Sequence, residues 1–207
     1  MPRLLWIAIA VTTLSGPARA DQLHKHSGLF IQVAPGVAYL ASGTSGGPDE
    51  NITGFGGTLD LRLGWFLKNT LAVVAHAYGA GARHATVSDP QLGPFVAPRG
   101  VPLTTGSTRM IGLGLGALYY FVPGNFFVSG AVDVTNLNLT DGTNALATDT
   151  SGIGMALALG REWWVTTHWS LGFTLSFALA VNLGSTGDHS AWITSVPSMG
   201  LTSSWSL

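Results

Sequence analysis

Apolar residues alternate with small or polar residues along several segments of the chain. In residues 110–121 the odd positions are apolar, whereas Gly112, Gly114 and Gly116 lie among the even positions. Successive side chains of a β-strand point to opposite faces, so this segment is predicted to be a strand with one apolar face and one small-residue face. Similar alternation predicts seven further strands, three of them clearly and four more weakly. They cover residues 58–67, 152–160 and 169–179, and then 29–41, 71–82, 126–137 and 191–207.

Two prolines interrupt the weaker alternation of the first and last predicted strands. Pro35 lies in the first of them and Pro197 in the last. Proline cannot donate a hydrogen bond to a neighbouring strand. We therefore expect these two strands to pair with each other where the sheet closes, with bulges or bends near the prolines.

The composition indicates which face of the strands is outside. Only 9% of the residues are charged, against about 25% in an ordinary soluble domain. A soluble, lipocalin-like barrel would turn the apolar face inward and expose glycine, alanine, serine and threonine, with few of the lysines and glutamates that a solvated surface carries. The composition favours the reverse arrangement, with the apolar face on lipid and the small face in a lumen. Lipid requires every backbone group to be paired, which a closed barrel achieves.

Short and long connections alternate between the predicted strands. Short turns fall at residues 68–69, 122–125 and 164–168, and longer loops at 42–51, 83–106, 138–150 and 182–190. This alternation and an even strand count predict an all-β fold: an eight-stranded antiparallel transmembrane up-and-down β-barrel with short turns in the periplasm and four loops outside. The loop from Arg83 to Gly106 contains four prolines and is a candidate contact surface.

Aromatic residues gather near the predicted short turns and the C-terminus, as expected for an aromatic girdle at one membrane interface. A thinner ring of Tyr39, Phe55 and Trp192 is expected at the loop end. The girdle residues are Trp65, Tyr119, Phe121, Phe126, Trp163, Trp164, Trp169 and Trp205.

Two segments resemble those of known proteins. Residues 160–172 (GREWWVTTHWSLG) resemble the turn between two late strands of a proteobacterial outer-membrane-barrel family. The ending Leu201-x-Ser203-x-Trp205-x-Leu207 resembles the C-terminal signal that the barrel-assembly machinery reads, although such proteins usually end in Phe or Trp. The mature chain is thus similar to the small eight-stranded outer-membrane β-barrels of Gram-negative bacteria. The resemblance implies an outer-membrane location and three partners: membrane lipid, lipopolysaccharide and the assembly machinery.

The first twenty residues have the pattern of a secretory signal peptide. Arg3 precedes an apolar run from Leu4 to Leu14, and Ala18-Arg19-Ala20 provides a cleavage site. A membrane anchor would need a run of about 17 or more apolar residues. We therefore expect a cleaved segment 1–20 and a barrel domain 21–207. A net charge of -1 argues against nucleic-acid binding, and the absence of cysteine excludes disulfides and thiolate metal sites.

Strand parity places five ionisable side chains in the lumen, where charges must be paired. They are Asp60, Arg62, His76, Asp133 and Glu162. We expect Arg62 to pair with Asp60, Asp133 or both, and Glu162 to be solvated near the periplasmic mouth. Glycines along the same face either line an eccentric cavity or let the strands bend, and parity does not decide between these alternatives.

Catalytic and metal sites have only weak candidates. Asp188, His189 and Ser190 are adjacent, but neighbours on a strand point to opposite faces, so they form a triad only if they lie in a loop. His24 and His26 have a metal-like spacing without a nearby third ligand, which favours a solvated tail. We therefore expect no metal and no cofactor.

The sequence predicts a non-enzymatic outer-membrane barrel with an envelope-structural or surface-contact role through its four loops. The alternative is a narrow, porin-like channel for small or apolar solutes. A lipid-modifying enzyme is a third candidate and would require a catalytic triad in a loop.

Overall fold

A computed structural model describes residues 26–45, 51–83, 85–88, 107–140, 148–183 and 191–207. The predicted signal peptide, the Asp188–Ser190 triplet and most of the Arg83–Gly106 loop lie outside these residues. The described residues form nine strands: β1 (Leu29–Ser45), β2 (Asn51–Lys68), β3 (Leu71–Arg83), β4 (Thr86–Ser88), β5 (Ser107–Phe121), β6 (Phe126–Thr140), β7 (Thr148–Trp164), β8 (Trp169–Leu183) and β9 (Ala191–Ser206).

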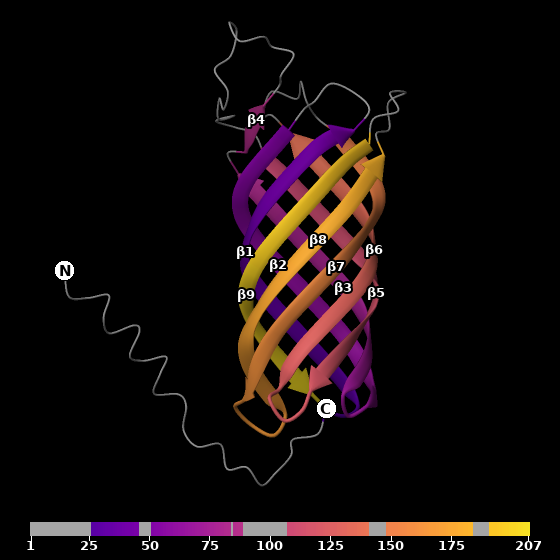
Figure 1. The fold of residues 1–207 in the computed structure, drawn as a ribbon, viewed down its shortest axis with the longest axis vertical. Coiled ribbons are helices and arrows are strands. Elements are labelled where there is room, and N and C mark those ends of the chain that lie inside the picture. The colour runs from indigo at the N-terminus through magenta and orange to yellow at the C-terminus, as the bar shows by residue number, and fades with distance from the viewer. Residues whose placement is uncertain (1–25, 46–50, 84, 89–106, 141–147, 184–190) are drawn as a thin grey trace, which may run out of the picture.

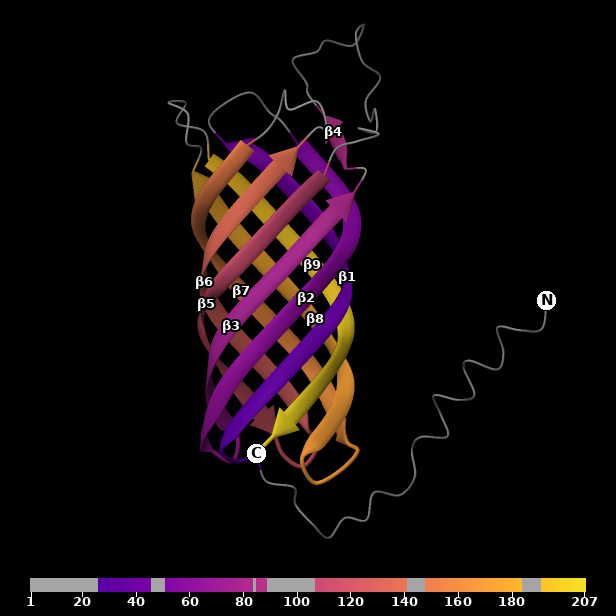
Figure 2. The same cartoon turned by 180° about the vertical axis from the view of Figure 1, so that it is seen from behind.

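Eight of these strands close into an antiparallel up-and-down barrel, as predicted (Figure 1). Each pairs with its neighbour in the chain, and β1 pairs with both β2 and β9, so the barrel has no free edge. The short strand β4 pairs with the first three residues of β2 at the loop end of the barrel, beyond the end of β3. Figure 2 shows the same tilted strands from behind, with the C-terminus at the turn end. The eight predicted strands all exist, and most are several residues longer than the alternation suggested.

The expected bulges at the two prolines are absent from the described β1–β9 pairing. Val33 pairs with Ser203, Gly36 with Gly200 and Ala38 with Ser198, which is one constant register along the whole pair. Each proline side chain is exposed on the outer face. Each proline therefore lacks an N–H for the pairing, but neither strand contains the extra residue of a β-bulge. The register does shift between Phe66 and Lys68, beside the turn from β2 to β3.

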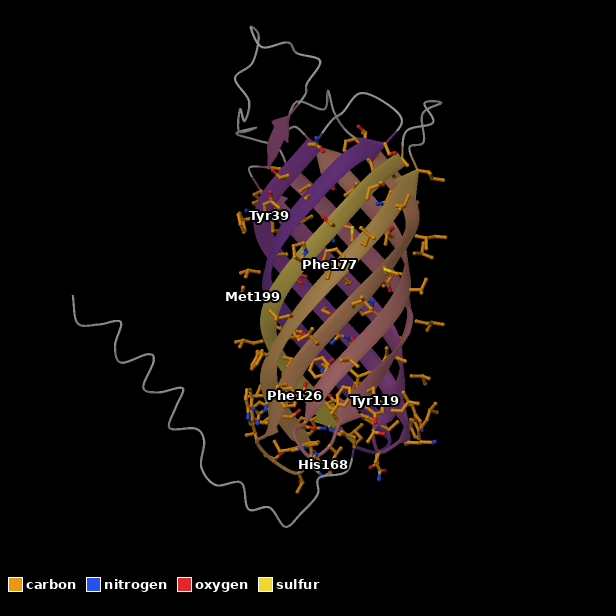
Figure 3. All side chains as sticks on the ribbon, in the orientation of Figure 1. Tyr39, Tyr119, Phe126, His168, Phe177 and Met199 are labelled. Atoms are coloured by element: carbon orange, nitrogen blue, oxygen red, sulfur yellow. The ribbon has the colours of Figure 1, made fainter. Side chains whose placement is uncertain are left out.

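The outer face of the barrel is apolar along most of its height. Leu113, Leu115, Ile153 and Leu175 are each at least 47% exposed, whereas the alternate residues of the same strands point inward. In Figure 3 the side chains of Phe177 and Met199 lie partway up the barrel on this face. Within the described part of the chain, no helix is long and apolar enough to cross a membrane.

Candidate functional site: the barrel interior

The interior has three levels between the turn end and the loop end. An aromatic cluster that includes Phe30, Phe66 and Tyr120 occupies the turn end. A second apolar cluster, with Leu40 and Trp192 among its members, occupies the loop end. Between and alongside them lie buried polar residues from every strand of the barrel, and we refer to these as the polar network. Its members are Gln32, Asp60, Arg62, His76, Tyr120, Asp133, Glu162, Ser170, Thr202 and Ser204.

Glu162 on β7 accepts hydrogen bonds from four other strands. Its Oε1 accepts from Gln32 Nε2 at 2.8 Å, from Thr202 at 3.1 Å and from Ser204 at 2.6 Å. Its Oε2 accepts from Tyr120 Oη at 3.0 Å and from Ser170 at 2.8 Å. Burial of an ionised carboxylate is costly unless its lone pairs are satisfied. Five donors meet that need, and they tie β1, β5, β8 and β9 to β7.

Glu162 was expected to be solvated, and that expectation is wrong. Glu162 is 1% exposed, because side chains from the other strands surround its carboxylate and exclude water. The backbone of Glu162 is also held by the turn between β5 and β6, since its N–H donates to Asn125 O at 3.1 Å. Sequence parity placed Glu162 on the inner face but carried no information about which side chains fill the space above it.

Arg62 on β2 connects Glu162 to the acidic side chains of the network. Its Nη1 donates to Gln32 Oε1 at 2.6 Å, and the Nε2 of the same amide donates to Glu162. Its Nη2 forms an ion pair with Asp60, two residues away on the same face of β2. The guanidinium carbon also lies 5.9 Å from the ring centre of Phe127. Arg62 therefore pairs with Asp60 and contacts Glu162 indirectly through an amide.

His76 on β3 lies between two carboxylates. Its Nδ1 is 2.9 Å from Asp133 Oδ1 on β6, and its Nε2 is 3.3 Å from Asp60 Oδ1 on β2. The second contact is at ion-pair distance without hydrogen-bond alignment. The His76 ring is therefore hydrogen-bonded to Asp133 through one nitrogen and faces Asp60 with the other. Asp133 thus meets His76 and does not meet Arg62.

Glycines make room for three of the contacts that cross an intervening strand. Gly114 pairs with both His76 and Asp133, and Gly172 pairs with both Glu162 and Thr202. A Cβ at Gly114 would overlap Val132 O and Asp133 Oδ1, and one at Gly172 would overlap Arg161 O. The small face of the strands therefore gives polar side chains the space to reach over a strand.

The third of these contacts lies nearer the loop end and has the same geometry. Thr135 Oγ1 on β6 donates to Asn182 Oδ1 on β8 at 2.7 Å, across Gly152 on β7. A Cβ at Gly152 would overlap Val181 O. Three separate bridges of this kind indicate why the inner face is rich in glycine, a question that the alternation alone left open.

His26 is buried at the turn end, so the prediction of a solvated tail is wrong at this residue. Its ring stacks on Tyr120 with 3.9 Å between centroids and lies 5.1 Å from the ring of Phe66. Its Nε2 is 2.9 Å from Asn125 Oδ1. His24 lies outside the described residues. Residues before β1 therefore cover the aromatic cluster at the turn end.

Most of the predicted girdle lies on the outer face at the turn end. Figure 3 shows Tyr119 and Phe126 there, close to the turn that carries His168. Trp164 differs, because its ring lies 4.9 Å from His26 on the inner side. The exposed girdle side chains are Trp65, Tyr119, Phe121, Phe126, Trp163 and Trp205, and Trp169 is half-buried with its indole N–H bonded to Ser203 Oγ.

The expected ring at the loop end is incomplete. Tyr39 and Phe55 lie on the outer face with their ring centroids 4.9 Å apart. Trp192 is 6% exposed and belongs to the interior cluster at the loop end. Trp192 has an even number, like the inward residues Thr194 and Val196 of the same strand. This parity predicts an inward side chain, whereas its position near the strand end suggested a membrane-interface residue.

Sequence reasoning missed half of the polar network. Tyr120, Ser170, Thr202 and Ser204 were not identified as partners of Glu162, although parity places all of them on the inner face. A serine or threonine on a small-residue face gives no sign of the carboxylate that it meets across the barrel. Among the described residues, no group of three or more His, Cys, Asp or Glu is placed to hold a metal ion.

Three solved structures that are similar to this chain cover most of its length. Neisserial surface protein A is 14% identical, with 85% of this chain and 96% of that chain covered and a TM-score of 0.52. OprG from Pseudomonas aeruginosa is also 14% identical, with 90% and 100% covered and a TM-score of 0.51. AlkL, solved in lipid bilayers, is 13% identical, with 93% and 96% covered and a TM-score of 0.51. No protein-family profile and no curated protein sequence matches the chain.

The fold is that of the small eight-stranded outer-membrane β-barrels. Its outer face is apolar, every barrel strand is paired on both sides, and aromatic residues mark the membrane interface at the turn end. These are the features that let a β-sheet cross a lipid bilayer. The chain is therefore an integral protein of the bacterial outer membrane.

Proposed function

We propose that this outer-membrane barrel is closed to solutes and non-enzymatic, and that it acts through its outer surface and its loops in an envelope-structural or surface-contact role. The observation that carries the proposal is the set of five hydrogen bonds on Glu162. The donors come from β1, β5, β8 and β9 and meet Glu162 in the interior of the barrel. Their side chains therefore occupy the space through which a channel would have to run.

The packing of the two apolar clusters supports a closed interior. Tyr120, Phe30 and Phe127 of the turn-end cluster are each about 1% exposed, and Leu40 and Leu137 of the loop-end cluster are not exposed at all. Eight-stranded barrels have an interior just wide enough for side chains to fill. The proposal extends that general rule to this chain.

The burial of the ionisable residues supports the non-enzymatic part of the proposal. Asp60, His76 and Asp133 resemble the carboxylate–histidine arrangement that orients the histidine of an acid–base site. Each of the three residues, however, is at most 4% exposed. Both His76 nitrogens already face carboxylates, so neither is directed at a substrate. A general base must reach the proton that it removes.

The proposal is tested by conductance measurements in planar bilayers. The protein is refolded, its folding is verified by heat-modifiable gel mobility, and a general porin is measured in the same bilayers as a positive control. The folded protein is expected to give no discrete current steps while the porin conducts. Discrete steps from the folded protein would overturn the proposal in favour of the narrow channel.

A further inference from the structure

The pairing between the first and last strands of the barrel is interrupted twice. We refer to this β1–β9 pairing as the seam, and its two strands lie side by side in Figure 2. The seam lacks paired residues at β1 positions 34–35 and 39–40, whereas β1–β2 and β8–β9 pair without a gap. The first gap contains Pro35, and the second lies opposite Pro197. Because proline has no N–H to donate, the backbone holds the seam less completely than the pairings beside it.

Side chains fasten the seam at the turn end. The Gln32 amide on β1 donates from Nε2 to Glu162 Oε1 at 2.8 Å, so it reaches past β9 and β8 to β7. Its Oε1 accepts from Arg62 Nη1 on β2 at 2.6 Å. Ser204 on β9, which pairs with Gln32, donates to the same Glu162 oxygen at 2.6 Å. One buried amide thus joins strands on both sides of the seam, and we refer to Gln32, Glu162 and Ser204 as the latch.

A second side-chain contact fastens the seam at the loop end. Ser42 on β1 and Thr194 on β9 are directly opposite each other, and their hydroxyl oxygens are 2.8 Å apart. The two residues are 3% and 0% exposed. Both gaps in the backbone pairing lie between this contact and the latch. Polar side chains therefore supplement the seam on either side of the stretch where pairing is incomplete.

The latch is complete only when the barrel is closed. Four of the five donors to Glu162 lie within 42 residues of it in the chain, whereas Gln32 is 130 residues away. The four are on β5, β8 and β9, so their contacts do not require β1 to be in place. Closing a long loop costs more conformational entropy than closing a short one, and contacts between distant residues form slowly. The Gln32 contact is therefore expected to form last.

We propose that the latch closes the barrel. The strands enter the membrane with β1 and β9 apart, and the seam shuts when the Gln32 amide inserts between Glu162 and Arg62. Insertion satisfies both ends of the amide and gives Glu162 its fifth donor, so side chains supply hydrogen bonds beside the gaps at the prolines. Gln32 is 0% exposed, and a buried amide is stable only when it is bonded. This closing step is independent of what the loops contact and of whether the interior conducts.

Refolding into lipid vesicles tests the latch, because insertion and closure have separate readouts. Tryptophan fluorescence follows insertion, since Trp65, Trp163 and Trp205 lie on the outer face, and heat-modifiable gel mobility follows closure. In the wild type the two signals should rise together. Gln32→Leu should insert at the wild-type rate but close about five-fold more slowly, which is the rate equivalent of one buried hydrogen bond.

Two further variants show whether the delay belongs to the seam. Ser204→Ala removes one hydroxyl from the latch and should give a smaller delay of the same kind, and it is the milder variant if Gln32→Leu does not fold. Thr135→Val is the matched control, because it removes the Thr135–Asn182 bond between β6 and β8, away from the seam. In this control the two signals should stay together. Equal delays in the control and the latch variants, or no delay in either latch variant, would overturn the proposal.

A covalent seam separates a closing role from general stabilisation. Val37 and Met199 are paired on the outer face of the seam, and Leu113 and Val134 are paired on the outer face between β5 and β6. In the Gln32→Leu background, a disulfide formed before refolding through Val37→Cys/Met199→Cys should restore closure to the rate of insertion. The Leu113→Cys/Val134→Cys disulfide should leave the delay unchanged. Equal rescue by the two disulfides, or no rescue by the seam disulfide, would overturn the latch as the closing element.

Discussion

The side chains of His76 and Asp133 meet across a strand that lies between them. Their Nδ1 and Oδ1 atoms are 2.9 Å apart, although His76 is on β3, Asp133 is on β6 and β5 separates the two. The contact is made over Gly114, which pairs with both residues. Contacts of this kind hold strands together that share no backbone hydrogen bonds, and they fill the interior as they do so.

The substitution Gly114→Ala is expected to destabilise the barrel by about 1–3 kcal/mol, the usual cost of overpacking. The new methyl group would overlap the Val132 carbonyl and the Asp133 carboxylate. Urea unfolding in lipid vesicles, followed by tryptophan fluorescence, measures the change in free energy. Gly57→Ala is the matched control, because a Cβ there lies 3.9 Å from its nearest neighbour, Gly36 O. Equal unfolding midpoints for the two variants would contradict this role of Gly114.

Removal of the Glu162 carboxylate should be among the most damaging changes in the interior. Glu162→Ala leaves five buried donors without their acceptor, and one unsatisfied buried group costs about 1–3 kcal/mol. We expect a loss of at least about 3 kcal/mol in the free energy of unfolding. Glu162→Gln retains the shape and one acceptor oxygen and should lose less. A loss below about 1 kcal/mol for the alanine variant would show that the donors find water instead.

A charge on the outer face should be costly at mid-height and tolerated near the loop end. Leu113→Arg places a guanidinium on the lipid face, at an expected cost of about 2–4 kcal/mol, whereas the cost near an interface falls to about 0–1 kcal/mol. Leu183→Arg, on the same face at the loop end of β8, is the depth control. The folded fraction after refolding into vesicles gives the comparison. Similar losses in both variants would mean that the apolar belt is placed wrongly.

The alternation of residues predicted the barrel because lipid and lumen impose opposite demands on successive side chains. The same parity placed Arg62 and Glu162 on the inner face. It could not predict that Gln32 would join them, since that contact depends on the diameter and stagger of the closed barrel. Nor could it predict the burial of His26, which precedes β1 and carries no strand periodicity.

Water access to the interior tests the central claim most directly, and the absence of cysteine from the chain makes the measurement simple. Thr174→Cys places a thiol on the inner face of β8, where the native residue is 3% exposed, and Leu175→Cys places one on the outer face, where it is 47% exposed. In folded protein in vesicles permeabilised to the reagent, a water-soluble maleimide should label neither thiol, whereas a lipid-soluble maleimide should label only Leu175→Cys. Both should react after unfolding. Rapid labelling of folded Thr174→Cys by the water-soluble reagent would show that water enters the barrel and would contradict a closed interior.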